Sequence, residues 1–163
     1  MDLTDQEIIS LLQYSFVRLD GAWFLSLAKS HGVDTAWNTD VEVWKHFSYL
    51  FGKKLRSDHI SQPVWPDSFI EAMEILAKVL KIEGREVILE PDRIIIRVTD
   101  CETQKAIAKA NVADCGIATI YTYQGLVRGL FNKEIEIDVE HTKNLNHGDP
   151  YCEVIIRLLP YRK

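Results

Sequence analysis

Apolar residues recur at spacings of three and four through the first half of the chain, which is the period of an amphipathic helix. The first pattern begins at a capping box formed by Thr4 and Glu7 and ends near Gly32. Gly21 interrupts it, which predicts either a kink or the close approach of another backbone. We therefore predict one long helix, with the apolar stripe Ile8, Leu12, Phe16, Leu19, Trp23 and Leu27.

Two more helices are predicted before Gly84. The second begins at a capping box of Thr39 and Glu42, and the third begins at one of Ser68 and Glu71. Their apolar stripes are most simply core-facing surfaces. These stripes are Val41, Trp44, Phe47, Phe51 and Leu55 in the second helix, and Phe69, Met73, Leu76 and Leu80 in the third.

After the third helix the apolar period changes to that of a β-strand. Residues 86–90 and 93–99 predict a hairpin whose turn contains Pro91. Residues 134–141 and 151–159 alternate between apolar and polar positions, so they predict two further strands.

The segments between these strands are predicted to be helical. A short helix is expected over residues 102–111, and a second helix over residues 115–131 with Asp114 as its cap. Three helices, a hairpin, two helices and a hairpin describe an α+β fold with an antiparallel sheet. We expect one domain over residues 1–163, with a helical region at 1–84 and a sheet region at 85–163.

The last two strands also predict a register. If they pair antiparallel with apolar residues opposite one another, Glu136 faces Arg157 on the outer side. The pair at the open end then brings an imidazole beside a thiol. The predicted pairs are Ile135 with Leu158, Ile137 with Ile156, Val139 with Val154, and His141 with Cys152.

Composition and charge narrow the class of protein. The 163 residues include 19 Lys and Arg against 24 Asp and Glu, a formal charge of −5 that repels nucleic acid. No apolar run approaches the roughly 20 residues of a membrane span, and the N-terminus lacks the features of a signal peptide. The three cysteines are an odd number at wide spacing, which suits reduced thiols better than disulfides. We therefore expect a cytoplasmic protein.

Cys115, Cys152 and His141 form a candidate metal site. Cys115 is predicted at the first turn of a helix, where the dipole stabilises a thiolate, and the predicted register places His141 beside Cys152. With His147 or Cys101 as a fourth ligand, these residues would complete the tetrahedral set that zinc prefers. No local pair of ligands is present, so buried structural cysteines are the simpler interpretation. The cofactor is left open, with zinc as the candidate.

The loop over residues 144–151 offers a second kind of chemistry. It is rich in turn-forming residues, and a plain hairpin loop is the simplest interpretation. It also brings His147 and Asp149 close to Cys152, with His141 nearby. A thiol, an imidazole and a carboxylate are the groups of a Cys-His nucleophilic site, so these four are the candidate catalytic residues.

Arg18 and Asp20 are charged residues inside an otherwise apolar helix, where charges tend to be paired. A solvated edge of the helix is one interpretation. The functional interpretation is that Arg18 reaches an acidic partner or a bound anion, with Gly21 allowing close approach. Together with Trp23 and Tyr121, these two residues are the candidate ligand contacts.

Four short motifs resemble an uncharacterised prokaryotic family of small cytosolic proteins. They are Arg18-Leu-Asp-Gly-Ala-Trp-Phe24, Val43-Trp44, Asp114-Cys115 and Gly148-Asp149-Pro150-Tyr151-Cys152. The second half is also similar, more distantly, to 4-vinyl-reductase-like sensing domains and to L-2-amino-thiazoline-4-carboxylate hydrolase-like proteins. The first of these groups implies a bound small molecule and, in some members, zinc held by cysteines and an acidic residue. The second implies a Gly-Asp-Pro-type turn before a cysteine strand.

Three functions are compatible with these patterns. The leading interpretation is a small-molecule-binding or sensing module, with a pocket between the N-terminal helices and the sheet that Cys115, His141 and Cys152 approach. The alternatives are a hydrolase-type enzyme with a Cys152 thiolate and a nearby histidine, and an interaction subunit without its own chemistry. The wide apolar stripes also predict a homodimer through the helical half, which holds Trp23, Trp37, Trp44 and Trp65.

Overall fold

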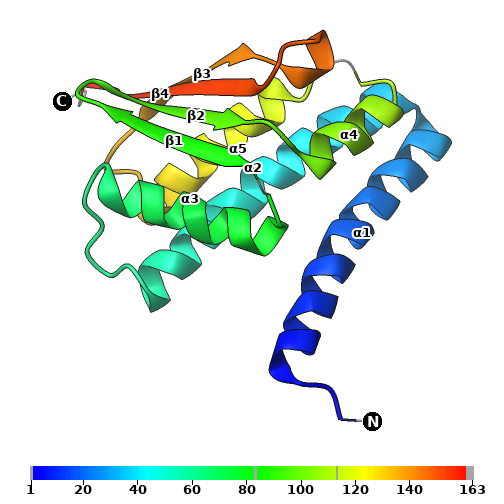
Figure 1. Cartoon of the computed structure of the whole chain (residues 1–163), viewed down its shortest axis with the longest axis horizontal. Helices are drawn as coiled ribbons and strands as arrows, with labels where there is room; N and C mark the ends of the chain where they lie inside the picture. Colours follow the sequence, from blue (N-terminus) through cyan, green and yellow to red (C-terminus); the bar gives the residue numbers. More distant parts are fainter. Residues whose placement is uncertain (1, 83, 113, 161–163) are drawn as a thin grey trace.

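The computed structural model describes residues 2–82, 84–112 and 114–160 of the chain. Three helices come first, then a hairpin, two helices and a second pair of strands, so the predicted α+β order is confirmed (Figure 1). The elements are α1 (Asp5–His31), α2 (Val33–Asp58), α3 (Asp67–Leu80), β1 (Arg85–Glu90), β2 (Arg93–Val98), α4 (Glu102–Lys109), α5 (Gly116–Leu130), β3 (Ile137–Lys143), the 3-10 helix η1 (Leu145–His147) and β4 (Cys152–Leu158).

The four strands form one antiparallel sheet in the order β1-β2-β4-β3. The β1–β2 hairpin has the predicted turn, closed by the pairing of Glu90 with Arg93. In Figure 1, α3 and α5 lie beneath the sheet and α1 lies outermost. Because α5 packs against both α2 and β3, it forms the layer between the helical half and the sheet.

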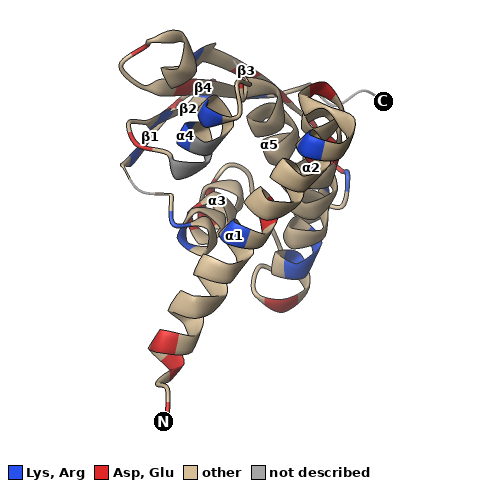
Figure 2. Cartoon of the chain, turned by 90° about the vertical axis from the view of Figure 1, so that its right-hand side faces the viewer, with Lys and Arg blue, Asp and Glu red and all other residues tan. Residues whose placement is uncertain are grey.

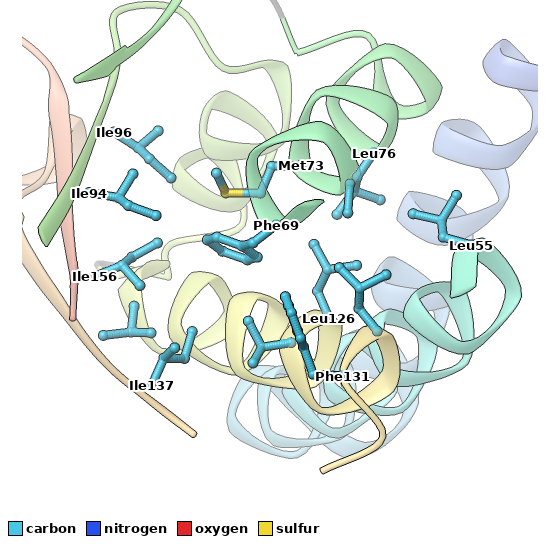
Figure 3. Close-up of a cluster of buried hydrophobic side chains, with 14 of the residues drawn as sticks. Leu55, Phe69, Met73, Leu76, Ile94, Ile96, Leu126, Phe131, Ile137 and Ile156 are labelled. Atoms are coloured by element: carbon cyan, nitrogen blue, oxygen red, sulfur yellow. The ribbon is translucent and has the colours of Figure 1, made fainter. Parts of the chain in front are cut away.

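The main core lies where α3 meets the sheet. In Figure 3, Phe69 and Met73 of α3 lie close to the strand residues Ile94, Ile96 and Ile156. All five are at most 1% exposed. Burial of side chains of this size contributes about 1.5–3 kcal/mol each, so this cluster ties the helical half to the sheet.

The opposite face of the sheet carries ion pairs. Arg97 Nε donates to Glu153 Oε2 at 2.8 Å, and Arg157 Nη1 lies 3.5 Å from Glu140 and 3.9 Å from Asp138. Both arginines are partly exposed, so solvent screening weakens each pair. These charges leave that face in contact with solvent, and the hydrophobic core therefore lies on one side of the sheet only.

α2 and α5 pack closely because small residues meet at their contact. Ser48 is fully buried there, and its hydroxyl lies where a side chain on Gly125 would have to go. A Cβ on Gly129 would overlap the carbonyl oxygen of Tyr49 and lie 2.9 Å from the backbone nitrogen of Lys53. Only glycine allows the two backbones to approach this closely.

α1 has no buried residue. It begins at the predicted capping box, in which Glu7 N donates to Thr4 Oγ1 at 3.3 Å and Thr4 N donates to Glu7 Oε2 at 2.8 Å. Gln13 Nε2 joins it to α3 by donating to the carbonyl of Lys78 at 2.8 Å. Figure 2 shows that most of the α1 ribbon beyond its acidic first turn is uncharged. Within the described ranges, no helix is long and apolar enough to cross a membrane.

The other two predicted capping boxes are wrong. α2 begins at Val33, and Thr39 lies inside it with its hydroxyl donating to the carbonyl of Thr35 at 2.8 Å. At the start of α3, Ser68 Oγ accepts from the backbone nitrogen of Val64 at 2.9 Å. Serine and threonine hydroxyls satisfy nearby backbone groups in several ways, so the box pattern alone does not locate a helix start.

The predicted register of the last two strands is wrong by two residues. Val139 pairs with Ile156 rather than Val154, and His141 pairs with Val154 rather than Cys152. A displacement of two preserves the alternation of faces, so the apolar pattern cannot distinguish the two registers.

Two features of the sheet fix the observed register. A bulge lies between His141 and Lys143, and β4 pairs along its other edge with β2. On the outer face, Asp138 consequently takes the place opposite Arg157 that was predicted for Glu136.

Gly129→Ala and Gly21→Ala test the packing of α2 against α5. Gly129→Ala should lower the free energy of unfolding by about 1–3 kcal/mol, because the added methyl group overlaps the backbone of α2. α1 continues through Gly21, and nothing lies within 4 Å of an added Cβ there. Gly21→Ala should therefore raise the free energy of unfolding by up to about 1 kcal/mol. Urea denaturation measures both, and a shift of the same sign in the two variants would contradict the packing argument.

Candidate functional site

A cavity of about 140 Å³ lies between the helices and the sheet. Side chains from α2, α3, α4, α5 and all four strands reach it, and most of its wall is apolar. The wall consists of Asp40, Trp44, Met73, Leu76, Ala77, Leu80, Ile82, Arg85, Ile96, Val98, Cys101, Gln104, Ile107, Cys115, Ala118, Thr119, Thr122, Tyr123, His141, Cys152 and Val154.

One side of α5 forms a polar strip on this wall. Thr119, Thr122 and Tyr123 share one face of the helix because they are separated by three and four residues. Thr122 Oγ1 donates to the carbonyl of Ala118 at 2.8 Å, so its hydroxyl is satisfied within the helix. Burial raises the pKa of Tyr123 to about 12, and its hydroxyl is therefore a hydrogen-bond donor at neutral pH.

All three cysteines are free, and all three line the cavity. Cys101 Sγ accepts from the backbone nitrogen of Gln104 and Cys152 Sγ from that of Leu145, both at 3.4 Å. Burial raises the pKa of Cys115 to about 12 and also raises the pKa of Cys152. Burial thus opposes the stabilisation that the helix dipole was expected to give a thiolate at Cys115, and a thiolate there stays a prediction.

His141 reaches the cavity from β3. Its ring lies over the start of α5, where a Cβ on Gly116 would be 2.9 Å from His141 Nδ1. Burial lowers the pKa of His141. The negative charge of Asp114 acts in the opposite direction but is the smaller effect, so the imidazole is neutral at pH 7. Asp114 Oδ1 accepts from the backbone nitrogen of Gly116 and from Asn144 Nδ2, both at 2.7 Å. This network fixes the edge of the cavity beside the imidazole.

The loop between β3 and β4 holds the other two candidate catalytic residues. Asp149 Oδ2 accepts from the backbone nitrogen of Asn144 at 2.7 Å, and His147 is exposed. Within the part of the chain that the structure describes, no hydrogen bond joins either residue to Cys152. A catalytic role for this group stays a prediction.

A second hollow, of about 610 Å³, runs between α1 and α2. Trp23 lies on its rim at 70% exposure, and Asp20 and Asp40 are its acidic groups. Desolvation, with a contribution from the charge of Asp20, raises the pKa of Asp40 to about 7; desolvation also raises the pKa of Asp20. Asp40 and Trp44 belong to the wall of both hollows, so the groove meets the cavity at these two residues.

The remaining predicted ligand contacts lie elsewhere. Arg18 is exposed on α1, with its guanidinium 5.2 Å from the ring centre of Tyr14. Tyr121 lies in a polar groove between α2 and α5, where Lys45 Nζ is 5.0 Å from its ring centre. The structure thus brings Cys115, Cys152 and His141 to the cavity wall together with Cys101, the alternative fourth zinc ligand. It places Arg18, Asp20, Trp23 and Tyr121 outside the cavity.

The donor set for zinc is not assembled in the described ranges. No group of three or more His, Cys, Asp or Glu residues there lies close enough together to hold a metal ion. A structural zinc takes four such ligands at about 2.0–2.3 Å. No zinc site is therefore shown.

Several residues of the cavity wall were missed by sequence reasoning. Thr119, Thr122 and Tyr123 did carry a signal, since they are polar groups at helical spacing on an otherwise apolar helix. Asp40 carried no such sequence signal, because it lies among polar neighbours at the edge of the apolar stripe of α2. Arg85 carried none either, since the groups that hold it belong to another element, α3.

A family model described as a family of unknown function (DUF6125) matches residues 2–152. The chain therefore belongs to this family, and the predicted resemblance to a family without an assigned activity is confirmed in that respect. A search of curated proteins finds no match.

Solved structures share the fold at low sequence identity. A trafficking protein particle complex subunit 3 from Naegleria fowleri, covalently bound to palmitic acid, is 16% identical with a TM-score of 0.59, covering 94% of this chain and 99% of that one. The phenol-responsive sensory domain of the transcription activator PoxR, with phenol, is 13% identical with a TM-score of 0.55, covering 85% and 72%. An H-NOX protein from S. oneidensis is 16% identical with a TM-score of 0.45, covering 98% and 78%. Such likeness shows the fold alone.

The buried thiols predict slow chemical modification. At pH 7, Cys115 and Cys152 in the native protein should react with iodoacetamide at least about tenfold more slowly than in urea-unfolded protein, because both are buried and their raised pKa values keep the thiolate fraction low. Timed alkylation followed by peptide mass spectrometry measures each cysteine. Fast alkylation of Cys152 below pH 7 that His141→Ala abolishes would instead favour a nucleophilic site.

Proposed function

We propose that this member of the DUF6125 family is a small-molecule-binding or sensing module whose ligand occupies the cavity between the helices and the sheet. The observation that carries the proposal is the cavity itself, about 140 Å³ with a mainly apolar wall. Protein interiors are close-packed, so a hollow of this size with an apolar wall is a candidate ligand site.

The volume indicates the class of ligand. An engineered protein cavity of about 150 Å³ with an apolar lining stays dry and binds benzene. The present cavity has nearly the same volume, so it fits a single aromatic ring or a branched aliphatic group of similar size. We therefore infer a small, largely apolar ligand with few polar atoms.

His141 and Tyr123 would supply the polar contacts. A neutral imidazole has one nitrogen that accepts a hydrogen bond, and within the described residues no hydrogen bond occupies the ring of His141. It would accept a hydrogen bond from a hydroxyl group on the ligand. The hydroxyl of Tyr123 would donate to an acceptor, and the thiols of Cys115 and Cys152 would add polarisable contacts.

The structural neighbours support this reading of the fold. Two proteins that share it were solved with a bound molecule that is largely apolar, palmitic acid in one and phenol in the other. Phenol is a single ring with one hydroxyl group, which is the size and polarity that the cavity in this chain would accept.

The hydrolase-type alternative has less support. It needs a Cys152 thiolate near neutral pH, whereas burial raises the pKa of Cys152. His147 is also exposed, and Asp149 is engaged with the backbone of its own loop. A binding module needs none of these groups to ionise. The free thiols further suit action in a reducing compartment such as the cytoplasm.

Fluorobenzene and 4-fluorophenol, followed by fluorine NMR, test the cavity. Both should bind, and Ala118→Leu should weaken both by about tenfold or more, because the larger side chain fills the space that the ring needs. Ala108→Leu makes the same exchange on the exposed side of α4 and should leave both affinities unchanged.

His141→Phe separates the polar contact from the apolar one. It should weaken 4-fluorophenol about tenfold relative to fluorobenzene, since it removes the nitrogen that accepts from the hydroxyl. Absence of binding for both probes, or equal binding in Ala118→Leu, would show that the cavity is not a ligand site. Mass spectrometry of an organic extract of the purified protein would then identify any molecule carried from the cell.

We also propose that two copies of the chain associate through the helical half. The ten large apolar residues of α1 with the greatest exposure are 37–70% exposed. A helix that is apolar on nearly every side is normally covered by other protein. The same surface would serve the interaction-subunit alternative if the partner were a different protein.

Sedimentation equilibrium tests this association directly. At micromolar concentration the measured mass should approach twice the 18.8 kDa of one chain and should fall on dilution. A mass of one chain at every concentration would exclude a homodimer.

A further inference from the structure

The outward side of α1 carries a stripe of large and small residues in a definite order. Successive members are four, three, four, three and four residues apart, which places them on one face of the helix. All six are exposed, and the three large ones are 42%, 64% and 61% exposed. The stripe consists of Ile8, Leu12, Ser15, Leu19, Ala22 and Ser26.

The other side of α1 is the one that meets the rest of the chain. Gln13 bonds to α3, and Asp20, Phe24 and Leu27 line the groove beside α2, whose edge Leu19 of the stripe also reaches. The first four are only partly exposed. Both Figure 1 and Figure 2 show the N-terminal half of α1 projecting beyond the other helices, so a second helix has room to lie along it.

We propose that this stripe is a seam at which α1 packs antiparallel against α1 of a second copy, with the two helices crossing near Val17. The proposal rests on the self-association proposed above and names its surface and register. Three contacts form, each occurring twice by symmetry. They place Ile8 against Ser26 of the partner subunit, Leu12 against Ala22 of the partner subunit, and Leu19 against Ser15 of the partner subunit.

The order of residue sizes favours this arrangement over a parallel one. In the antiparallel register a large side chain meets a small one at every level, so the helices keep a constant separation and leave no void. In a parallel register each residue would meet its own copy. Ile8 and Leu12 would then crowd one end of the seam, while Ala22 and Ser26 would leave the other end empty.

The stripe is the apolar centre of a larger exposed surface on α1. At roughly 200 Å² for a large residue, its three large members expose on the order of 300 Å² per chain, and all ten exposed apolar residues of α1 together expose on the order of 1,000 Å². A stable protein interface takes about 800 Å² from each partner, so the contact also includes residues beside the stripe. No charged residue lies within the stripe, so packing two copies desolvates no unpaired charge there.

Exchanging a large and a small residue tests the register. Leu12→Ala leaves a void and Ala22→Leu makes a clash, so each alone should weaken dimerisation by about tenfold or more. The double variant Leu12→Ala/Ala22→Leu restores a large residue opposite a small one and should recover the affinity to within about threefold. Leu89→Ala, at a 56% exposed site on β1, is the control and should have no effect. Sedimentation equilibrium measures the affinities, and circular dichroism confirms that each variant is folded.

Cysteine cross-linking tests the direction of packing in a Cys101→Ser background. A mixture of Leu12→Cys and Ala22→Cys chains should form a disulfide between the two variants, and neither should cross-link to itself. Positions 12 and 22 lie about 15 Å apart along one helix, whereas a disulfide needs Cα atoms within about 7 Å. Only an antiparallel register can therefore join them.

The outcomes separate this seam from the proposals on which it rests. A dimer that the size exchange leaves unchanged, or Leu12→Cys chains that cross-link to themselves, would overturn the seam while self-association stands. A protein that is monomeric at every concentration would overturn both. Binding of the fluorinated probes reports on the cavity in either case.

Discussion

The close packing of α5 against α2 is the contact on which the rest of the structure depends. Gly125 and Gly129 let the two backbones meet, with Ser48 buried between them. α5 can then turn one side to α2 and another to the sheet, so the helix that completes the helical layer also forms a wall of the cavity. Larger residues at these positions would push α5 outward, and the start of the helix, over which the ring of His141 lies, would move with it.

The cavity that results suits binding better than nucleophilic chemistry. Burial raises the pKa values of Cys115, Cys152 and Tyr123 and lowers that of His141, so it disfavours the charged form of each. Asp40, at the boundary with the groove, follows the same rule. Its pKa is raised from 3.8 to about 7, so the folded state binds more protons than the unfolded state in that interval. This group therefore costs stability as pH rises from about 4 to about 7.

The two hollows share part of a wall. The groove beneath α1 and the cavity beneath the sheet meet at Asp40 and Trp44. The groove is bounded by α1, which is also the helix that exposes the apolar seam.

The sequence by itself determined the class of fold, the order of the elements, the first helix with its capping box, and the hairpin at Pro91. These depend on period, caps and turns, which act over a few neighbouring residues. Tertiary structure decided the register of β3 on β4, because a displacement of two residues leaves the pattern of faces unchanged. It also decided the direction in which the pKa of Cys115 shifts, since burial by distant elements raises it. Tertiary structure also decided the cavity, because the side chains that line it are far apart in the chain and no local sequence pattern predicts that they come together.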